Sequence, residues 1–326
     1  MPRYIRNTVV LAKVETTSGV DIVPTVGANA ILVSDMTITP LDAQNIDRNL
    51  VRGYFGASEQ LVGPASVKVS FTVELAGSGT AATAPAWGAL MQGCAFAEAA
   101  GLTTQARCEY TPISTLLKSL SIYYYDDGVL HKLLYAMGNF TLSAKVGERP
   151  VLKFEFTGLD GGISAATPGA TTLTAWQKPV AVTKANTVID ISLGATYAAA
   201  TGVTAGTTYP STGLELMCGN DVSYSALLSS EGVDITNRQM TGHVDLDLTA
   251  AQEVSLMASV KGNTTQSLGF TLGTVAGNKI LIHCPAVQLL SPTKQELNGR
   301  RLCGYDLRMV PAATGGGNDE IRLVTL

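Results

Sequence analysis

The chain has 326 residues, of which 46% are apolar and 15% are charged. This composition supplies enough apolar surface for a folded core and excludes an intrinsically disordered chain. A net charge of −4 excludes tight, phosphate-directed binding to nucleic acid, because that affinity comes from Lys and Arg residues that displace counterions.

The N-terminus and the cysteines bear on where the protein works. Residues 1–15 lack the apolar run of a secretory signal, and no later window reaches the length of a membrane helix. We therefore expect a protein made in the cytoplasm, with no membrane insertion. The five cysteines are scattered and form no CxxC pair, which favours buried, reduced thiols over disulfides or a zinc site: Cys94, Cys108, Cys218, Cys284 and Cys303.

Alternation of apolar and polar residues is the main structural signal along the chain. It begins in residues 67–75, where Val67, Val69 and Phe71 alternate with polar residues. The same period of two recurs in residues 152–156, 244–248 and 303–309. Such segments are typical of strands that bury one face, so the chain is predicted to be mainly β.

Two short helices are also predicted. The first follows Pro85, where apolar residues fall at helical spacing: Trp87, Leu90, Met91 and Cys94. The second covers residues 249–262, in which Thr249 and Gln252 have capping-box spacing and Gly262 can end the helix. We expect the buried face of this second helix to consist of Ala250, Val254 and Met257.

Each predicted helix is followed by a long predicted hairpin. The first hairpin covers residues 119–143 and the second covers residues 267–291. Both contain a dipeptide that readily adopts the positive φ of a tight turn. The residues expected at the two hairpin tips are Asp126, Asp127 and Gly128 in the first and Gly277 and Asn278 in the second.

The order of alternating strand, helix, long hairpin and final strand thus occurs twice. This repetition predicts a gene duplication that produced two tandem β-sandwich domains, residues 1–165 and 177–326. Each domain is expected to contain one short helix and long hairpins. Residues 166–176, rich in Gly, Ala, Thr and Pro, are the predicted linker.

No motif for catalysis, nucleotide binding or metal binding is present. His131, His243 and His283 are far apart in the sequence and form no HExxH pattern. Asp126 and Asp127 could form an acid–base pair, but beside Gly128 they are better explained as turn formers. We therefore expect no enzyme activity, no cofactor and no metal. A hydrolase whose residues meet only in the folded chain stays open.

The segment RGYFGASEQLVG, residues 52–63, places two aromatic residues between glycines. Exposed aromatics in a loop commonly mark a surface that binds a partner. On that interpretation Tyr54, Phe55, Gly56 and Glu59 form a subunit or ring interface. The alternative is an ordinary loop whose aromatic side chains pack onto the core of their own chain.

Several separated segments, taken in order, resemble the major tail tube proteins of long-tailed (siphovirus) bacteriophages. RGYFGASEQLVG is followed by SVKVSFTVELAGSG and then by APAWGALMQGCAFAE. Further along, DGVLHKLLYAMGNFTLSAKVGERPVLKFEFTGL and AWQKPVAVTKANT resemble the same family. The resemblance covers about residues 1–190, and the remainder matches by pattern.

The resemblance implies a virion structural protein, a β-sandwich whose hairpins join those of neighbouring subunits in an inner β-barrel. Rings of such subunits stack into the tube that carries viral DNA into the host. The family's usual ring has six single-domain copies, so a duplicated chain implies three. The implied partners are other copies of the chain, the tape measure and tail terminator proteins, and DNA that passes without specific binding. Assembly would take place in the cytoplasm of the host bacterium.

One alternative function fits the same composition. A β-sandwich adhesin or carbohydrate-binding protein of the virion surface would also be β-rich and free of catalytic motifs. Such a protein would form no rings or tubes.

Overall fold

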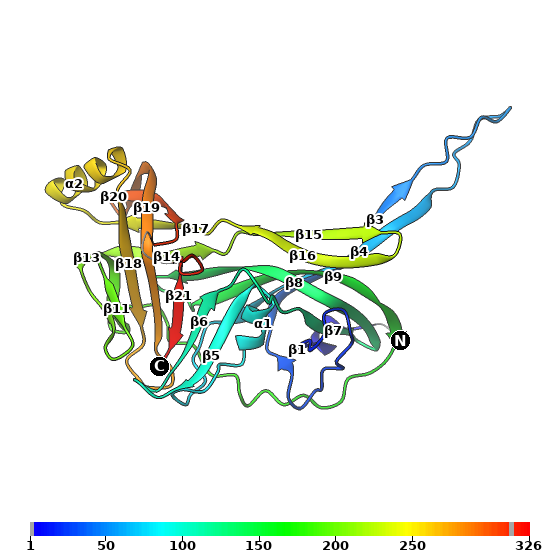
Figure 1. Cartoon of the computed structure of the whole chain (residues 1–326), viewed down its shortest axis with the longest axis horizontal. Helices are drawn as coiled ribbons and strands as arrows, with labels where there is room; N and C mark the ends of the chain where they lie inside the picture. The colour runs from blue at the N-terminus through cyan, green and yellow to red at the C-terminus, as the bar shows by residue number, and fades with distance from the viewer. Residues whose placement is uncertain (1–2, 313–315) are drawn as a thin grey trace.

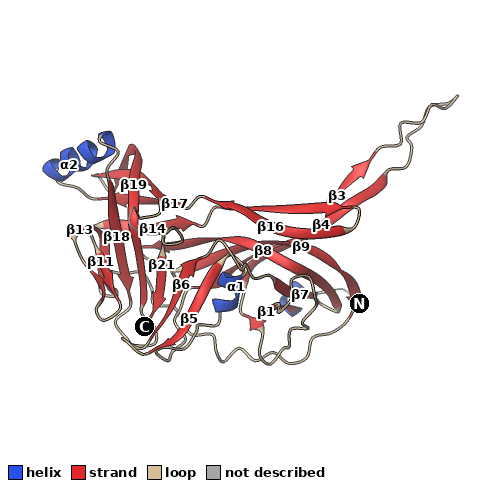
Figure 2. Ribbon diagram, in the orientation of Figure 1, coloured by secondary structure: helices blue, strands red, loops and turns tan. Residues whose placement is uncertain are grey.

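The computed structural model describes residues 3–312 and 316–326, and its regular structure consists mainly of strands (Figure 2). The first group of elements comprises η1 (Ile5–Asn7), β1 (Thr8–Val14), β2 (Ala30–Ile31), β3 (Ser34–Ile46), β4 (Leu61–Glu74), α1 (Gly88–Gln92), β5 (Phe96–Leu102), β6 (Arg107–Pro112), β7 (Leu120–Asp126), β8 (Val129–Lys145) and β9 (Val151–Ala165). The predicted mainly β class is confirmed.

The second group comprises β10 (Thr187–Leu193), β11 (Thr196–Ala198), β12 (Gly202–Thr204), β13 (Thr207–Tyr209), β14 (Ser211–Met217), β15 (Asn220–Leu227), β16 (Ser230–Arg238), β17 (Thr241–Leu246), α2 (Ala250–Lys261), β18 (Thr265–Leu272), β19 (Ile280–Leu297), β20 (Arg300–Met309) and β21 (Arg322–Thr325). Between the groups, residues 166–186 contain no helix or strand. We call the two groups the N-terminal and C-terminal strand sets.

Both strand sets use the same order of antiparallel neighbours. In the N-terminal set the order is β1–β7–β8–β9–β4–β3. In the C-terminal set it is β10–β18–β19–β20–β17–β14. The helices hold equivalent places, because α1 comes after β4 and α2 comes after β17. The two sets thus share one strand order, and the division into two duplicated domains, residues 1–165 and 177–326, stays a prediction.

Strand pairing joins the two sets at two places. The C-terminal half of β8 pairs with β14, with Thr141 opposite Met217 and Lys145 opposite Gly213. The final strand, β21, pairs with β19 on one side and with β6 on the other. As a result, seventeen strands of the described residues form one connected sheet system, and no pairing among those residues closes it into a barrel.

The joint at β21 also contains a buried carboxylate. Glu109 on β6 accepts hydrogen bonds from Arg107, Tyr197 and Arg322, and so links β6 to both β11 and β21. Although burial raises its pKa, the hydrogen bonds from Tyr197 and Arg107 hold the pKa of Glu109 below its usual value. The carboxylate therefore stays ionised between its cationic partners.

One large hydrophobic core lies beneath both sets, and two smaller apolar clusters lie beside it. Alternate residues of β4 and β9 point into the large core, and the rings of Phe154 and Phe156 stack with centroids 5.8 Å apart. Phe71 of β4 lies directly opposite Phe154. The predicted alternation in residues 67–75 and 152–156 is confirmed, because its apolar positions are the buried ones.

The helices agree with the prediction in position and only partly in orientation. The four apolar residues predicted for the first helix are buried, and the Trp87 indole donates to the carbonyl of Ala76 at 2.8 Å. α2 has the predicted capping box at Thr249. Its predicted buried face is wrong, since Val254 is 71% exposed and Leu256 is buried. Figure 1 shows α2 at the periphery of the C-terminal strand set, and Leu256 is the buried residue of the helix.

Two hairpins extend from the body of the molecule (Figure 1). The hairpin of β3 and β4, which we call the arm, projects furthest and carries residues 47–60 at its end. The hairpin of β15 and β16 lies along the N-terminal set, where a Cβ at Gly232 would be 3.4 Å from the ring of Tyr135. In both sets a hairpin therefore extends from the same end of the sheet.

Asn220 locks the β15–β16 hairpin to the N-terminal set. Its buried side-chain amide donates to the carbonyls of Cys94 and Gly138, each at 2.9 Å. Its backbone N–H donates to the side chain of Asn139 at 2.6 Å, and the Asn139 amide donates to the carbonyl of Asn220. These bonds satisfy buried backbone groups of the two sets at the point where the sets meet.

We predict that Asn220→Ala lowers the free energy of unfolding by about 1–3 kcal/mol, because two buried carbonyls lose their donors. Urea unfolding of the dissociated chain would measure the change. Asn237→Ala, on an exposed position of β16, is the matched control and should stay within about 0.5 kcal/mol of the parent. Equal stability of the two variants would contradict the role given to Asn220.

Candidate assembly surfaces

Eight strands drawn from both sets form one continuous antiparallel sheet, which we call the wall. Its order is β3–β4–β9–β8–β14–β17–β20–β19, four strands from each set. The pairing of β8 with β14 is what makes the two halves of the wall continuous. One face of the wall packs on the core, and the other, the polar face, is turned away from it.

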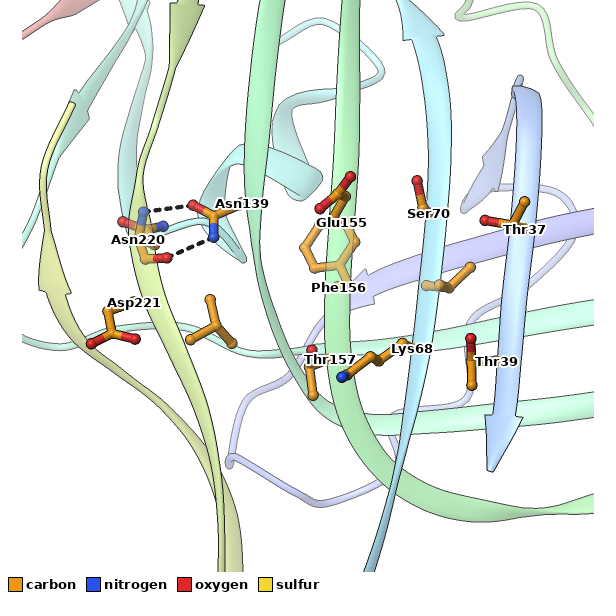
Figure 3. A pocket seen from close by; sticks show the side chains of 12 residues that line it. Thr37, Thr39, Lys68, Ser70, Asn139, Glu155, Phe156, Thr157, Asn220 and Asp221 are labelled. Atoms are coloured by element: carbon orange, nitrogen blue, oxygen red, sulfur yellow. Dashed lines mark hydrogen bonds between the residues drawn. The ribbon is translucent and has the colours of Figure 1, made fainter. Parts of the chain in front are cut away.

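The polar face carries mostly hydroxyl, amide and charged side chains. Part of it forms a shallow hollow of about 480 Å³ (Figure 3). The side chains around this hollow come from adjacent strands, and most are small and polar: Thr37, Thr39, Lys68, Ser70, Asn139, Glu155, Thr157, Asn220 and Asp221. Val69, Phe156 and Val222 also line the hollow, but polar residues outnumber them, so it has the character of a wetted sheet surface more than that of a mostly apolar ligand pocket.

Several charges on the polar face lie next to opposite charges. Three lysines form ion pairs with carboxylates at 2.5–2.9 Å: Lys145 with Glu215, Lys153 with Glu155, and Lys68 with Asp42. The hydrogen bond to Glu215 raises the pKa of Lys145. At these three positions the surface presents no uncompensated positive charge.

A histidine on the same face lies between two carboxylates. The ring of His243 lies 3.0 Å from Asp306 and 3.2 Å from Asp245. Partial burial lowers its pKa, but the hydrogen bonds with Asp306 and Asp245 outweigh that effect, so the pKa of His243 is raised. Protonation of this ring would add a cation between two carboxylates.

The wall ends in two unpaired strand edges among the described residues. β3 pairs only with β4. At the other end, β18 pairs with β19 only as far as Gln288, and residues 290–297 of β19 pair only with β20. Residues 291–297 are all exposed. Unpaired edges of this length readily accept another strand.

The arm carries the aromatic residues that the sequence singled out. Tyr54 is 70% exposed and Phe55 is fully exposed, so the alternative in which they pack onto their own core is wrong. A Cβ at Gly56 would meet no atom within 4 Å. Glu59 forms ion pairs with Arg48 and Arg52. The four residues thus share one projecting segment, and their role as an interface stays a prediction.

The first predicted hairpin tip is a tight turn, as expected. Asp127 and Gly128 both have positive φ, 39° and 92°. The Asp127 carboxylate accepts hydrogen bonds from the Asn7 side chain and the Tyr4 backbone, and these bonds lower its pKa. Asp126 lies 3.5 Å from Arg3. The N-terminal segment therefore holds this tip in place.

The second predicted tip lies against the N-terminal set. Gly277 has a φ of 85°, and its carbonyl accepts from the N–H of Gly79 at 2.9 Å. The Asn278 side chain accepts from the N–H of Gly77 and donates to the carbonyl of Lys178. The turn is thus a further contact between the two strand sets. Whether either tip contributes to a barrel remains a prediction.

The titratable and thiol side chains that the sequence singled out are dispersed over the part of the chain that the structure describes. No three His, Cys, Asp or Glu residues there are grouped so that they could hold a metal ion. His131 lies on β8, His243 on β17 and His283 on β19. All five cysteines are buried and unpaired, as predicted. None of the described helices has the length and apolar character needed to cross a membrane.

Sequence reasoning did not identify the unpaired edges. The half-buried Met36 and Ile38 alternate with exposed residues on β3, which is a strand pattern, but Pro40 interrupts it. On β19, residues 291–297 are polar apart from Pro292 and Leu297 and give no sign of which strands flank them. Edge status depends on the neighbours in the fold, and a sequence pattern does not contain that information.

A comparison with protein families places the chain. The family model described as phage tail tube protein matches residues 5–326, which is nearly the whole chain. No curated protein matches it. The family match extends over both strand sets and confirms the resemblance seen in the separated segments. The chain therefore belongs to the phage tail tube protein family and is a structural component of a phage tail.

Proposed function

We propose that copies of this chain close into rings that stack as the tail tube, the conduit through which viral DNA leaves the particle. The observation that carries the proposal is the wall, an open sheet with a polar face and two unpaired edges. When copies join edge to edge, those edges become paired. Strands that would otherwise promote aggregation then form the contacts of the assembly. An adhesin that works as a single chain would leave both edges of the wall unpaired.

Three copies per ring fit the dimensions of a DNA conduit. The repeated strand order supports two duplicated domains in each chain, so three chains supply the six units of the usual ring. Three walls of eight strands, with strands ~4.8 Å apart and tilted by ~40°, give a circumference of about 150 Å and a diameter of about 48 Å. Side chains reduce the bore to about 38 Å. A whole B-DNA duplex, whose major groove alone is ~12 Å wide, should therefore pass through it.

The charge pattern of the polar face suits DNA that must move. A surface grips DNA when Lys and Arg displace the counterions of its phosphates. Here three lysines of the polar face are already paired with carboxylates. If this face lines the bore, those lysines have little free charge to offer a phosphate, and DNA passes without specific binding.

The remaining partners follow from the position of such a tube in a tail. Its ends must meet other tail proteins, which we take to be the tape measure protein inside and the terminator at one end. Assembly then takes place in the cytoplasm of the infected bacterium, where the DNA-filled heads are also built. The tail of a siphovirus is the setting that we propose.

We predict that the purified chain forms rings or tubes containing three chains per ring. Negative-stain electron microscopy would show hollow rings with six-fold features, and native mass spectrometry would give multiples of three chains. A chain that stays monomeric at high concentration and binds glycans would contradict the proposal and support the adhesin.

We also predict that Tyr54→Ala combined with Phe55→Ala weakens assembly and leaves folding intact. Both side chains are exposed in the single chain, so the free energy of unfolding should change by less than about 0.5 kcal/mol. Tube length by electron microscopy should fall. Leu116→Ala is the control, because Leu116 is equally exposed but lies off the arm. Tubes of unchanged length in the double variant would refute the interface.

A further inference from the structure

The pairing of β14 with β8 inside the chain indicates how two chains can pair with each other. β14, the edge of the C-terminal half of the wall, adds to the C-terminal half of β8. In the repeated strand order β3 holds the place of β14, and β19 holds the place of β8. The two unpaired edges of the wall are therefore the equivalents of two strands that already pair with each other.

The alignment of β3 with β14 follows from a break that both strands share. Pairing of β3 with β4 is interrupted after Thr39, before the distal part of the arm begins. Pairing of β14 with β17 ends at Met217, before the β15–β16 hairpin begins. Aligning Thr39 with Met217 makes Thr37 the equivalent of Glu215.

The same alignment can be followed across the sheet. Thr37 leads through one residue of β4 to Glu155 in β9. Glu215 leads through one residue of β17 to Asp306 in β20. Glu155 and Asp306 are therefore equivalent, and the residues that follow each of them, Phe156 and Leu307, are both buried in the core.

The last step extends the alignment to β8 and β19. Val151 lies four residues before Glu155 in β9, and Leu302 lies four residues before Asp306 in β20. Ser143 of β8 lies opposite Val151, and Gln295 of β19 lies opposite Leu302. Ser143 and Gln295 therefore hold equivalent positions, next to the edge that accepts a strand in one case and is unpaired in the other.

We propose that β3 of one copy adds, antiparallel, to the C-terminal half of β19 of a second copy of this chain. Within the chain Glu215 lies opposite Ser143, so Thr37 of one copy lies opposite Gln295 of the next. This inference rests on the proposed function and specifies the contact by which the ring closes. Each copy both gives and receives an edge, which allows a closed head-to-tail ring.

The placement of the arm follows from the same equivalence. β14 continues into the β15–β16 hairpin, which lies against β8 and β9 and contacts Tyr135. The corresponding continuation of β3 is the distal arm. It lies across β19 and β20 of the neighbouring copy and carries Tyr54 and Phe55 to that copy. On this proposal the two side chains are exposed in the single chain because they belong to one half of an interface.

A cysteine pair tests the register directly. Thr37→Cys with Gln295→Cys, oxidised after assembly, should yield reducible products of two and three linked chains on a denaturing gel. Because all five native cysteines are buried, the single variants should yield almost none. Thr37→Cys with Glu296→Cys is the matched control, since a shift of one residue turns the side chain to the opposite face, and its yield should be several-fold lower.

Two further samples keep the result interpretable. Ser143→Cys with Glu215→Cys places the pair at the joint within the chain and should give a link inside one chain without multimers. A mixture of chains carrying only Thr37→Cys with chains carrying only Gln295→Cys should give two linked chains and nothing larger. This mixture tests the contact even where the double variant assembles poorly.

The possible failures are distinguishable. If tubes form but the Thr37 and Gln295 pair links no better than the Thr37 and Glu296 pair, the proposed strand pairing is overturned and the tail tube function stands. If the parent chain forms no rings or tubes at all, the proposed function itself fails.

Discussion

The pairing of β14 with the C-terminal half of β8 is the interaction on which the architecture depends. Without it the wall would be divided into two four-stranded halves, and β14 and the C-terminal half of β8 would become unpaired edges. With it, the polar faces of both halves become one surface, and the β15–β16 hairpin is carried onto the N-terminal set, where Asn220 secures it. A single strand pairing thus determines the continuity of the wall and the position of the hairpin.

Local features of the fold were predictable because local chemistry determines them. Alternation located the core strands around Phe71 and Phe154, the spacing of Thr249 and Gln252 located the start of α2, and Asp127-Gly128 located a tight turn. The buried side of α2 was missed because helical periodicity defines several possible stripes, and only contact with a sheet selects one.

The candidate site was predictable in composition and not in geometry. Glycines beside Tyr54 and Phe55 marked the arm, but whether those rings face solvent depends on how far the hairpin projects. The joint of β8 with β14 brings together segments about seventy residues apart. Such a pairing leaves no periodic trace in either segment, so neither the wall nor its edges could be derived from the sequence.

The β5–β6 hairpin exists only in the N-terminal strand set, because α2 leads directly into β18. Inside the chain, β6 of this hairpin pairs with β21, and Glu109 binds Arg322 of β21 there. The hairpin thus strengthens the contact between the two strand sets. In a ring of three chains, contacts between the two sets of one chain would therefore alternate with contacts between chains, and the two kinds would differ. Within a chain the covalent connection gives the two strand sets a high effective concentration for each other, so their contact forms as the chain folds. In the proposed ring, the three contacts between chains would then be the reversible ones, where whole chains could join or leave before the ring closes.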